Sequence, residues 1–219
     1  MPKVSTEYIN NKKNSILEAA FSVCKNKPLY EITMKDIIKK SRVSQGGIYR
    51  YYSDIDDILI ALINKANTNA DYKQNIDEII QSSTTPKEVI ESIFDFIGKN
   101  LKENMTTTGK IQFELTVLLT NHPDRQEKFM SQITEMQNSQ YLMQHLFKKI
   151  NEGIEIGYFN PILPSKDIFC FIMTSIDGIV RDSILINCYE PIKNTQIEID
   201  EISLINTLSK AVLLMLNAY

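Results

Sequence analysis

The sequence contains no tryptophan and only seven glycines and seven prolines among its 219 residues. Folds built from many short strands need turn residues at regular intervals, so this scarcity argues against a β architecture. Apolar runs reach six residues, as at 168–173 and 211–216, whereas a membrane-spanning helix needs about 20. The amino terminus carries no apolar segment of the kind found in signal peptides. We therefore expect an all-α, cytoplasmic protein with no membrane association.

Cysteine and histidine are also scarce, with three and two residues. Cys170 and Cys188 lie on one predicted helix, about 27 Å apart at a rise of roughly 1.5 Å per residue, which is too far for a disulfide. His122 and His145 are too widely separated along the chain to suggest a metal cluster or a catalytic dyad. The sequence also lacks a glycine-rich phosphate loop and a nucleophile elbow. We therefore expect no enzyme: no catalytic residue, no metal site and no cofactor.

The charges are distributed unevenly along the chain. Residues 1–53 contain ten basic and four acidic residues, a net charge of +6, whereas residues 54–219 contain fourteen basic and twenty-three acidic residues, a net charge of −9. A basic head on an acidic body suits a protein that presents only its head to a polyanion such as nucleic acid. Chance clustering of solvated charges would give the same numbers, so motifs in the head have to show whether it binds nucleic acid.

The segment 33–52 predicts two short helices that meet at a tight turn. Thr33 and Asp36 have the spacing of a capping box, so a helix can begin there. Ser44 is a second N-cap candidate, and it would begin a recognition helix over residues 44–50. Such a pair, with its second helix in the major groove of DNA, is a helix-turn-helix.

Elsewhere, apolar residues recur at three- and four-residue steps, which predicts about nine helices in all and no convincing strand. The longest helix is expected over 123–156. The last two helices, near 165–188 and 200–218, are apolar on so many sides that they predict a subunit interface, with burial in the chain's own core as the alternative. We expect two domains, residues 1–66 with the helix-turn-helix and residues 67–219 as a separate helical body.

Four segments of the head together resemble one family. Their spacing is specific, because few other families place Ser-x-Gly-x-hydrophobic-Tyr-x-Tyr-aromatic directly after a capped helix. The segments are Ile16-Leu17-Glu18-Ala19-Ala20, Thr33-Met34-Lys35-Asp36-Ile37, Val43-Ser44-Gln45-Gly46-Gly47-Ile48-Tyr49-Arg50-Tyr51-Tyr52 and Ile58-Leu59. On these residues the chain resembles the TetR family of bacterial transcriptional regulators.

The resemblance implies an N-terminal three-helix DNA-binding domain followed by a helical ligand-binding and dimerisation domain. It also implies a homodimer that binds a palindromic operator in double-stranded DNA. In this family a small molecule bound in the helical body usually releases the DNA, so a ligand-responsive repressor is the main reading. The alternative is a family member without a small ligand, controlled by a partner or acting architecturally.

Two positions depart from the family pattern. Arg42 stands where the turn usually holds glycine, and a left-handed conformation costs a non-glycine residue on the order of 1 kcal/mol. A phosphate contact by Arg42 would offset this. Ile55 stands among three aspartates where the family often has a phosphate-binding lysine, so we predict one fewer phosphate contact per subunit. Tyr52, in contrast, occupies a position that the family keeps for a core aromatic.

The recognition helix contains the residue types that contact DNA. The Gln45 amide can pair bidentately with adenine, with a water-mediated contact as the alternative. Gly46 and Gly47 each lower helix stability by about 1 kcal/mol relative to alanine, which indicates either close approach of the backbone to DNA or a frayed helix held by packing. Tyr49 and Tyr51 are expected to donate their hydroxyls to phosphates. The predicted DNA-binding residues are Thr33, Lys35, Arg42, Ser44, Gln45, Gly46, Gly47, Tyr49, Arg50 and Tyr51.

In the helical body, polar residues interrupt or flank the apolar stripes. A mostly apolar pocket with a few placed polar groups is typical of small-molecule sites. The candidate residues are Gln112, Met136, Gln140, Tyr141, Met143, Phe147 and Asp177. For each of the polar ones, a satisfied interior group or a plain surface residue is the alternative.

Overall fold

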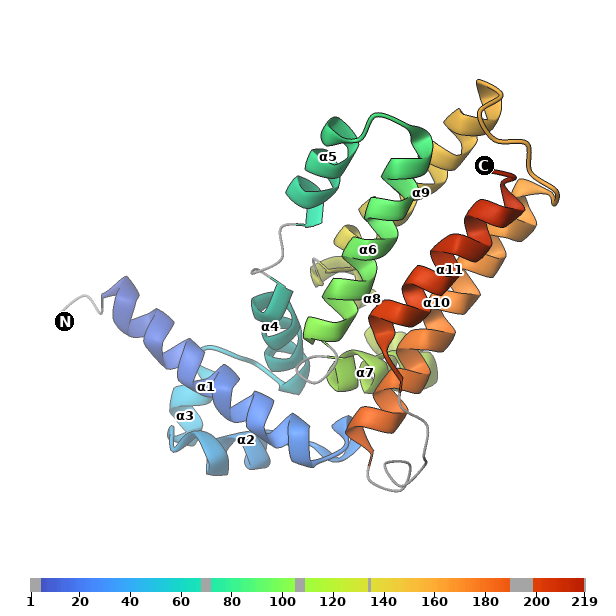
Figure 1. The fold of residues 1–219 in the computed structure, drawn as a ribbon. Helices are drawn as coiled ribbons and strands as arrows, with labels where there is room; N and C mark the ends of the chain where they lie inside the picture. The colour runs from blue at the N-terminus through green and yellow to red at the C-terminus, as the bar shows by residue number, and fades with distance from the viewer. Residues whose placement is uncertain (1–4, 68–71, 105–108, 134, 190–198, 219) are drawn as a thin grey trace. The chain divides into compact units, whose positions relative to one another are not determined.

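The computed structural model describes residues 5–67, 72–104, 109–133, 135–189 and 199–218. Over these residues the chain forms eleven α-helices and one 3-10 turn, and no strand (Figure 1). The predicted all-α class is therefore confirmed. The helices outnumber the nine expected because residues 72–82 form a helix of their own and the segment 123–156 contains two helices. Within the described residues, no helix combines the length and the apolar character needed to cross a lipid bilayer.

The chain divides into two compact units, one made of residues 1–69 and 111–135 and the other of residues 70–110 and 136–219. The expected boundary near residue 66 does not anticipate that the segment 111–135 packs with the N-terminal residues. The helices of the first unit are α1 (Thr6–Asn26), the 3-10 turn η1 (Leu29–Glu31), α2 (Met34–Ser41), α3 (Gln45–Tyr49), α4 (Ile55–Asn67), nearly all of α7 (Lys110–Asn121) and α8 (Pro123–Gln132).

The first unit is organised around α1, which contacts both α2 and α4 (Figure 1). Ser5 caps α1 by accepting a hydrogen bond from the backbone N–H of Tyr8. The buried face of α1 includes Ile16, Ala20 and Cys24, spaced four residues apart. This stripe packs into a core to which α2, α3, α4, α7 and α8 all contribute.

Three polar contacts fasten the segment 111–135 to the head. Glu114 of α7 accepts a hydrogen bond from the N–H of Leu29 at 2.8 Å. The Asn64 amide of α4 donates to the carbonyl of Gln132 at 2.7 Å. Ion pairs between α4 and α8, described below, form the third contact. The first unit thus includes two helices that the sequence assigns to the body.

The second unit contains α5 (Tyr72–Ser82), α6 (Pro86–Asn104), α9 (Glu135–Glu155), α10 (Ser165–Cys188) and α11 (Glu201–Met215). Helices α6 and α11 run side by side, and α10 packs against α11 (Figure 1). The core between these helices is built from isoleucine, leucine and phenylalanine, with Phe94 and Ile172 fully buried.

The single helix predicted over 123–156 is wrong. Ile133 has an extended conformation (φ −87°, ψ 114°) and ends α8, and α9 begins at Glu135. Phe129 and Ile133 are buried in the core of the first unit, whereas Leu146 is buried in the core of the second. The three- and four-residue periodicity continues across the break because the two helices each present an apolar face, although they present it to different cores.

Candidate nucleic-acid interface

A capping box fixes the start of α2. The Thr33 hydroxyl accepts from the backbone N–H of Asp36, and the Asp36 carboxylate accepts from the backbone N–H of Thr33 at 2.8 Å. The same carboxylate accepts from the Thr33 hydroxyl at 2.8 Å and pairs with the Lys27 ammonium at 3.0 Å. The hydrogen bonds from Thr33 and Lys27 lower the pKa of Asp36 to about 2. The predicted capping box is confirmed, and it orients the first helix of the motif.

The turn between α2 and α3 is closed by a left-handed residue. Arg42 has φ 57° and ψ 19°, the conformation that the sequence predicts for this position. The Ser41 hydroxyl donates to the carbonyl of Ile38 and accepts from the N–H of Val43, so it satisfies groups that the helix end leaves open. Arg42 is exposed, which leaves its guanidinium available to an outside partner.

The recognition helix α3 has one face inside and one face in solvent. Ser44 caps it, accepting from the N–H of Gly47 at 3.3 Å, as predicted. Ile48 is fully buried, and Tyr52, four residues later, is buried with it, which confirms the predicted core role of this tyrosine. The residues left exposed along α3 and its C-cap are Gln45, Gly46, Tyr49 and Arg50. Because their spacing is one and four residues, these four share a face of the helix.

The two glycines of α3 differ in their surroundings. Both have negative φ values, so neither is required by the backbone conformation. A Cβ atom on Gly47 would lie 2.9 Å from Cγ1 of Val43 and 3.1 Å from the hydroxyl of Ser44, so glycine is needed there for packing within the motif. A Cβ atom on Gly46 would meet nothing within 4 Å. Nothing inside the described molecule explains the glycine at Gly46, which is consistent with close approach of an external partner.

Comparison with known proteins decides the family. The model of the bacterial regulatory proteins of the tetR family matches residues 16–62, the span that contains the capped helix, the turn and the recognition helix. This chain belongs to the TetR family. The curated relatives include YfiR of Bacillus subtilis, an uncharacterized HTH-type transcriptional regulator that is 26% identical over 183 residues, covering 84% of this chain and 85% of YfiR. HbdR of Aromatoleum sp., also an HTH-type regulator, is 33% identical over 81 residues, 36% of this chain and 34% of HbdR.

Solved structures agree in fold. The fatty acid degradation regulator FadR of Bacillus halodurans superposes with a TM-score of 0.62 at 21% identity, covering 92% of this chain and 94% of that one. The regulator FadR of Bacillus subtilis, solved in complex with stearoyl-CoA, gives 0.58 at 20% identity, covering 94% and 98%. This TetR-family chain is therefore a DNA-binding transcriptional regulator with the fold of these proteins.

In this TetR-family head, three aspartates stand at the start of α4, directly after the recognition helix. Asp54 caps α4, because its carboxylate accepts from the N–H of Asp57 at 2.9 Å, and the Asp57 carboxylate in turn accepts from the N–H of Ser53 at 2.9 Å. Ile55, where the family often has a phosphate-binding lysine, is half-buried and packs against the core. The start of α4 therefore presents carboxylates and no cation of its own.

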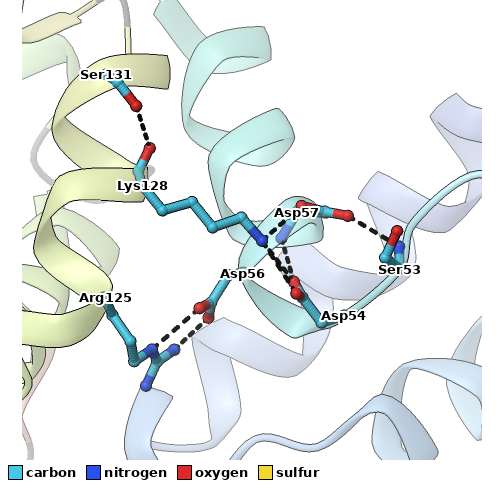
Figure 2. A network of polar contacts seen from close by, with 7 residues as sticks. All are labelled: Ser53, Asp54, Asp56, Asp57, Arg125, Lys128 and Ser131. Atoms are coloured by element: carbon cyan, nitrogen blue, oxygen red, sulfur yellow. Dashed lines mark hydrogen bonds and ion pairs between the residues drawn. The ribbon is translucent and has the colours of Figure 1, made fainter.

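Two cations of α8 pair with these aspartates (Figure 2). The Lys128 ammonium lies 2.7 Å from a carboxylate oxygen of Asp57 and 3.0 Å from both oxygens of Asp54. The Arg125 guanidinium donates to Asp56 through two nitrogens. The hydrogen bond from Lys128 lowers the pKa of Asp57. Burial opposes the charge of Lys128, but its hydrogen bonds to Asp57 and Asp54 outweigh this and raise its pKa.

The candidate ligand residues of this regulator are divided between the two units and differ in exposure. Gln140 and Asp177 are exposed. Gln112 belongs to the first unit and is half-buried, and the Met136 side chain lies outside the described residues. The buried face of α9 is centred on Leu142, Leu146 and Ile150, and Gln140 does not belong to it.

Three of the candidates, Tyr141, Met143 and Phe147, are half-buried against the core of the second unit. The Tyr141 hydroxyl donates to Asp77 of α5 at 2.6 Å, and the Phe147 ring stacks on Phe169 with centroids 4.4 Å apart. Phe147 also borders an open hollow of about 540 Å³ along α9, lined by Gln144, Phe147, Lys148, Asn151, Glu152 and Glu155. The ligand site stays a prediction.

Proposed function

We propose that the chain is a homodimeric repressor that binds a palindromic operator through α3 and is released by a small, largely apolar effector. The observation that carries the proposal is the division of α3 into two faces. Gln45, Gly46, Tyr49 and Arg50 are exposed together, while Ile48 anchors the helix in the core. A helix held on one side and polar on the other suits insertion into a major groove.

Within this proposal the residues of the motif have different tasks, including Tyr51, which is half-buried against the core of the first unit. Gln45 reads a base, because its amide offers one donor and one acceptor in the pattern that adenine presents. Tyr49, Tyr51 and Arg50 contact phosphates and set the register of the helix. Thr33, Lys35, Arg42 and Ser44 flank them and extend the phosphate contacts on either side of the turn. Gly46 lets the backbone approach the DNA.

An exposed apolar face supports the dimer. Phe171 of α10 is 42% exposed, and Leu204 and Leu214 of α11 are 38% and 56% exposed. Leu204, Ala211 and Leu214 follow one another at steps of seven and three residues, so they form one stripe along α11. A symmetric dimer through α10 and α11 would remove this stripe from water.

A protein of the same fold and the side chains of the second unit indicate the class of effector. FadR of Bacillus subtilis, which has the same fold, was solved with stearoyl-CoA. In the second unit of this chain, Met143, Phe147 and Phe169 are half-buried against the core, and the rings of Phe147 and Phe169 stack. An acyl chain is the ligand class that such side chains would accept. The exposure of Gln140 and Asp177 instead favours the alternative, a regulator controlled by a partner without a small ligand.

A titration of labelled duplexes from the gene's own promoter tests the proposal. We expect the wild type to bind one duplex far more tightly than a scrambled duplex of equal length, and stearoyl-CoA to release it. Tyr49→Phe removes one phosphate hydrogen bond per head, so the dimer loses two bonds of about 1 kcal/mol each, and binding to both duplexes should weaken roughly 30-fold. Equal affinity for promoter and scrambled duplexes would refute the regulator's specificity. If no acyl-CoA releases the DNA but an extract that contains a protein partner does, the result would favour a regulator controlled by a partner.

A further inference from the structure

The start of α4 places three negative charges close to the surface that is proposed to meet DNA. Asp54 follows Tyr49 by five residues, so their Cα atoms are at most about 17 Å apart even in a fully extended chain. The chain between them is folded back, because Tyr51 and Tyr52 both donate backbone hydrogen bonds to the carbonyl of Ile48. The screening length at 0.1 M salt is about 10 Å, so unpaired carboxylates here would repel nearby phosphates.

Arg125 and Lys128 of α8 counter this charge. Lys128 forms ion pairs with Asp54 and Asp57, and Arg125 forms one with Asp56 (Figure 2). The three aspartates alone would carry a charge of −3, and with the two cations the cluster carries a net charge of −1. The Arg125–Asp56 pair is mostly buried, with side-chain exposures of 25% and 14%. The Lys128 ammonium contacts the carboxylates of both Asp54 and Asp57. These partners are distant in sequence: Arg125 lies 69 residues after Asp56, and Lys128 lies 74 residues after Asp54.

We infer that Arg125 and Lys128 are positioning residues for DNA binding, which act as a charge shield over the carboxylates of α4. They touch no DNA in this account. They hold α4 against α8 and cancel most of the negative charge beside the recognition helix, so that the affinity of the head for DNA depends on α8 staying in place. The inference rests on the proposed function, since it needs α3 to bind a duplex.

A charge-rescue experiment separates the shield from a purely structural contact. Lys128→Gln leaves the α4 start one unit more negative and should weaken operator binding about fivefold at 0.1 M salt. Asp54→Asn removes one carboxylate but keeps the helix cap, because an asparagine oxygen still accepts from the N–H of Asp57. Asp54→Asn alone should therefore bind at least as tightly as the wild type, and the double variant should return to within twofold of it. Lys99→Gln, which removes a cation paired with Asp95 on α6, is the matched control for net charge and should change little.

A shield also predicts that the ratio of wild-type to Lys128→Gln affinity shrinks as salt rises from 0.05 to about 0.3 M, since repulsion is screened. The inference is overturned if Asp54→Asn weakens binding, if the double variant stays as weak as Lys128→Gln, or if Lys128→Gln binds like the wild type. Should Lys128→Gln fail to fold in a thermal melt, Asp54→Asn alone still tests the repulsion. A wild type that binds no duplex at all would instead refute the proposed function.

Discussion

Replacing Gly46 with alanine should make the protein more stable and its DNA binding weaker. The space around Gly46 is open, so the new methyl group meets no atom within 4 Å. Alanine is preferred to glycine in a helix by up to about 1 kcal/mol, and less near the end of a helix as short as α3. We therefore expect a gain of about 0.5 to 1 kcal/mol, which corresponds to a rise in Tm of roughly 1 to 4 °C for a chain of this size.

The effect on DNA binding has the opposite sign. If the backbone at Gly46 approaches the duplex closely, a methyl group there pushes α3 outward and lengthens the contacts of its neighbours. Losing two hydrogen bonds of about 1 kcal/mol each weakens binding roughly 30-fold. Differential scanning fluorimetry and an anisotropy titration on the same samples measure both quantities.

Gly47→Ala is the matched control. Its methyl group would lie 2.9 Å from Val43 and 3.1 Å from Ser44, so it strains the turn and disturbs the cap of α3. We expect about 1 kcal/mol of destabilisation and a loss of DNA binding that accompanies it. If Gly46→Ala binds DNA as tightly as the wild type, the backbone at Gly46 does not approach the duplex closely, and a lower Tm would contradict the open space around it.

Further predictions concern the turn, the cap and the dimer. Arg42→Gly removes the strain of the left-handed conformation and should raise Tm by about 2 to 4 °C. It should also weaken DNA binding and reduce the slope of log affinity against log salt concentration by about 1 per lost phosphate contact. An unchanged slope would exclude that contact. The pKa of Asp36, lowered to about 2 from 3.8, contributes stability above pH 4 that is lost as the pH falls towards 2, so Tm should drop less steeply over this range in Asp36→Asn than in the wild type. Leu204→Glu with Leu214→Glu should give monomers by sedimentation, and persistent dimers would place the interface elsewhere.

Local features of the head could be predicted from the sequence because the residues that form them are neighbours in the chain. The capping box of Thr33 and Asp36, the left-handed Arg42 and the buried Tyr52 are each set by a few adjacent residues and the family spacing. Their interactions span at most four positions, which is the range over which a sequence pattern is informative.

Features that depend on distant residues could not be found in this way. Nothing near Arg125 or Lys128 indicates that they pair with aspartates about 70 residues earlier. The break at Ile133 was hidden because apolar periodicity records that a face is buried without recording which core buries it. The prediction of Gln140 as a pocket residue assumed that α9 presents the stripe containing it, whereas the buried face is centred on Leu146.

A selection from a randomised duplex library shows whether α3 reads a specific operator. The wild type should enrich one inverted repeat. Gln45→Ala should enrich the same repeat with one symmetric pair of positions made degenerate, because only the base that Gln45 contacts loses its partner. No enriched sequence for the wild type, or an unchanged consensus for Gln45→Ala, would contradict the account.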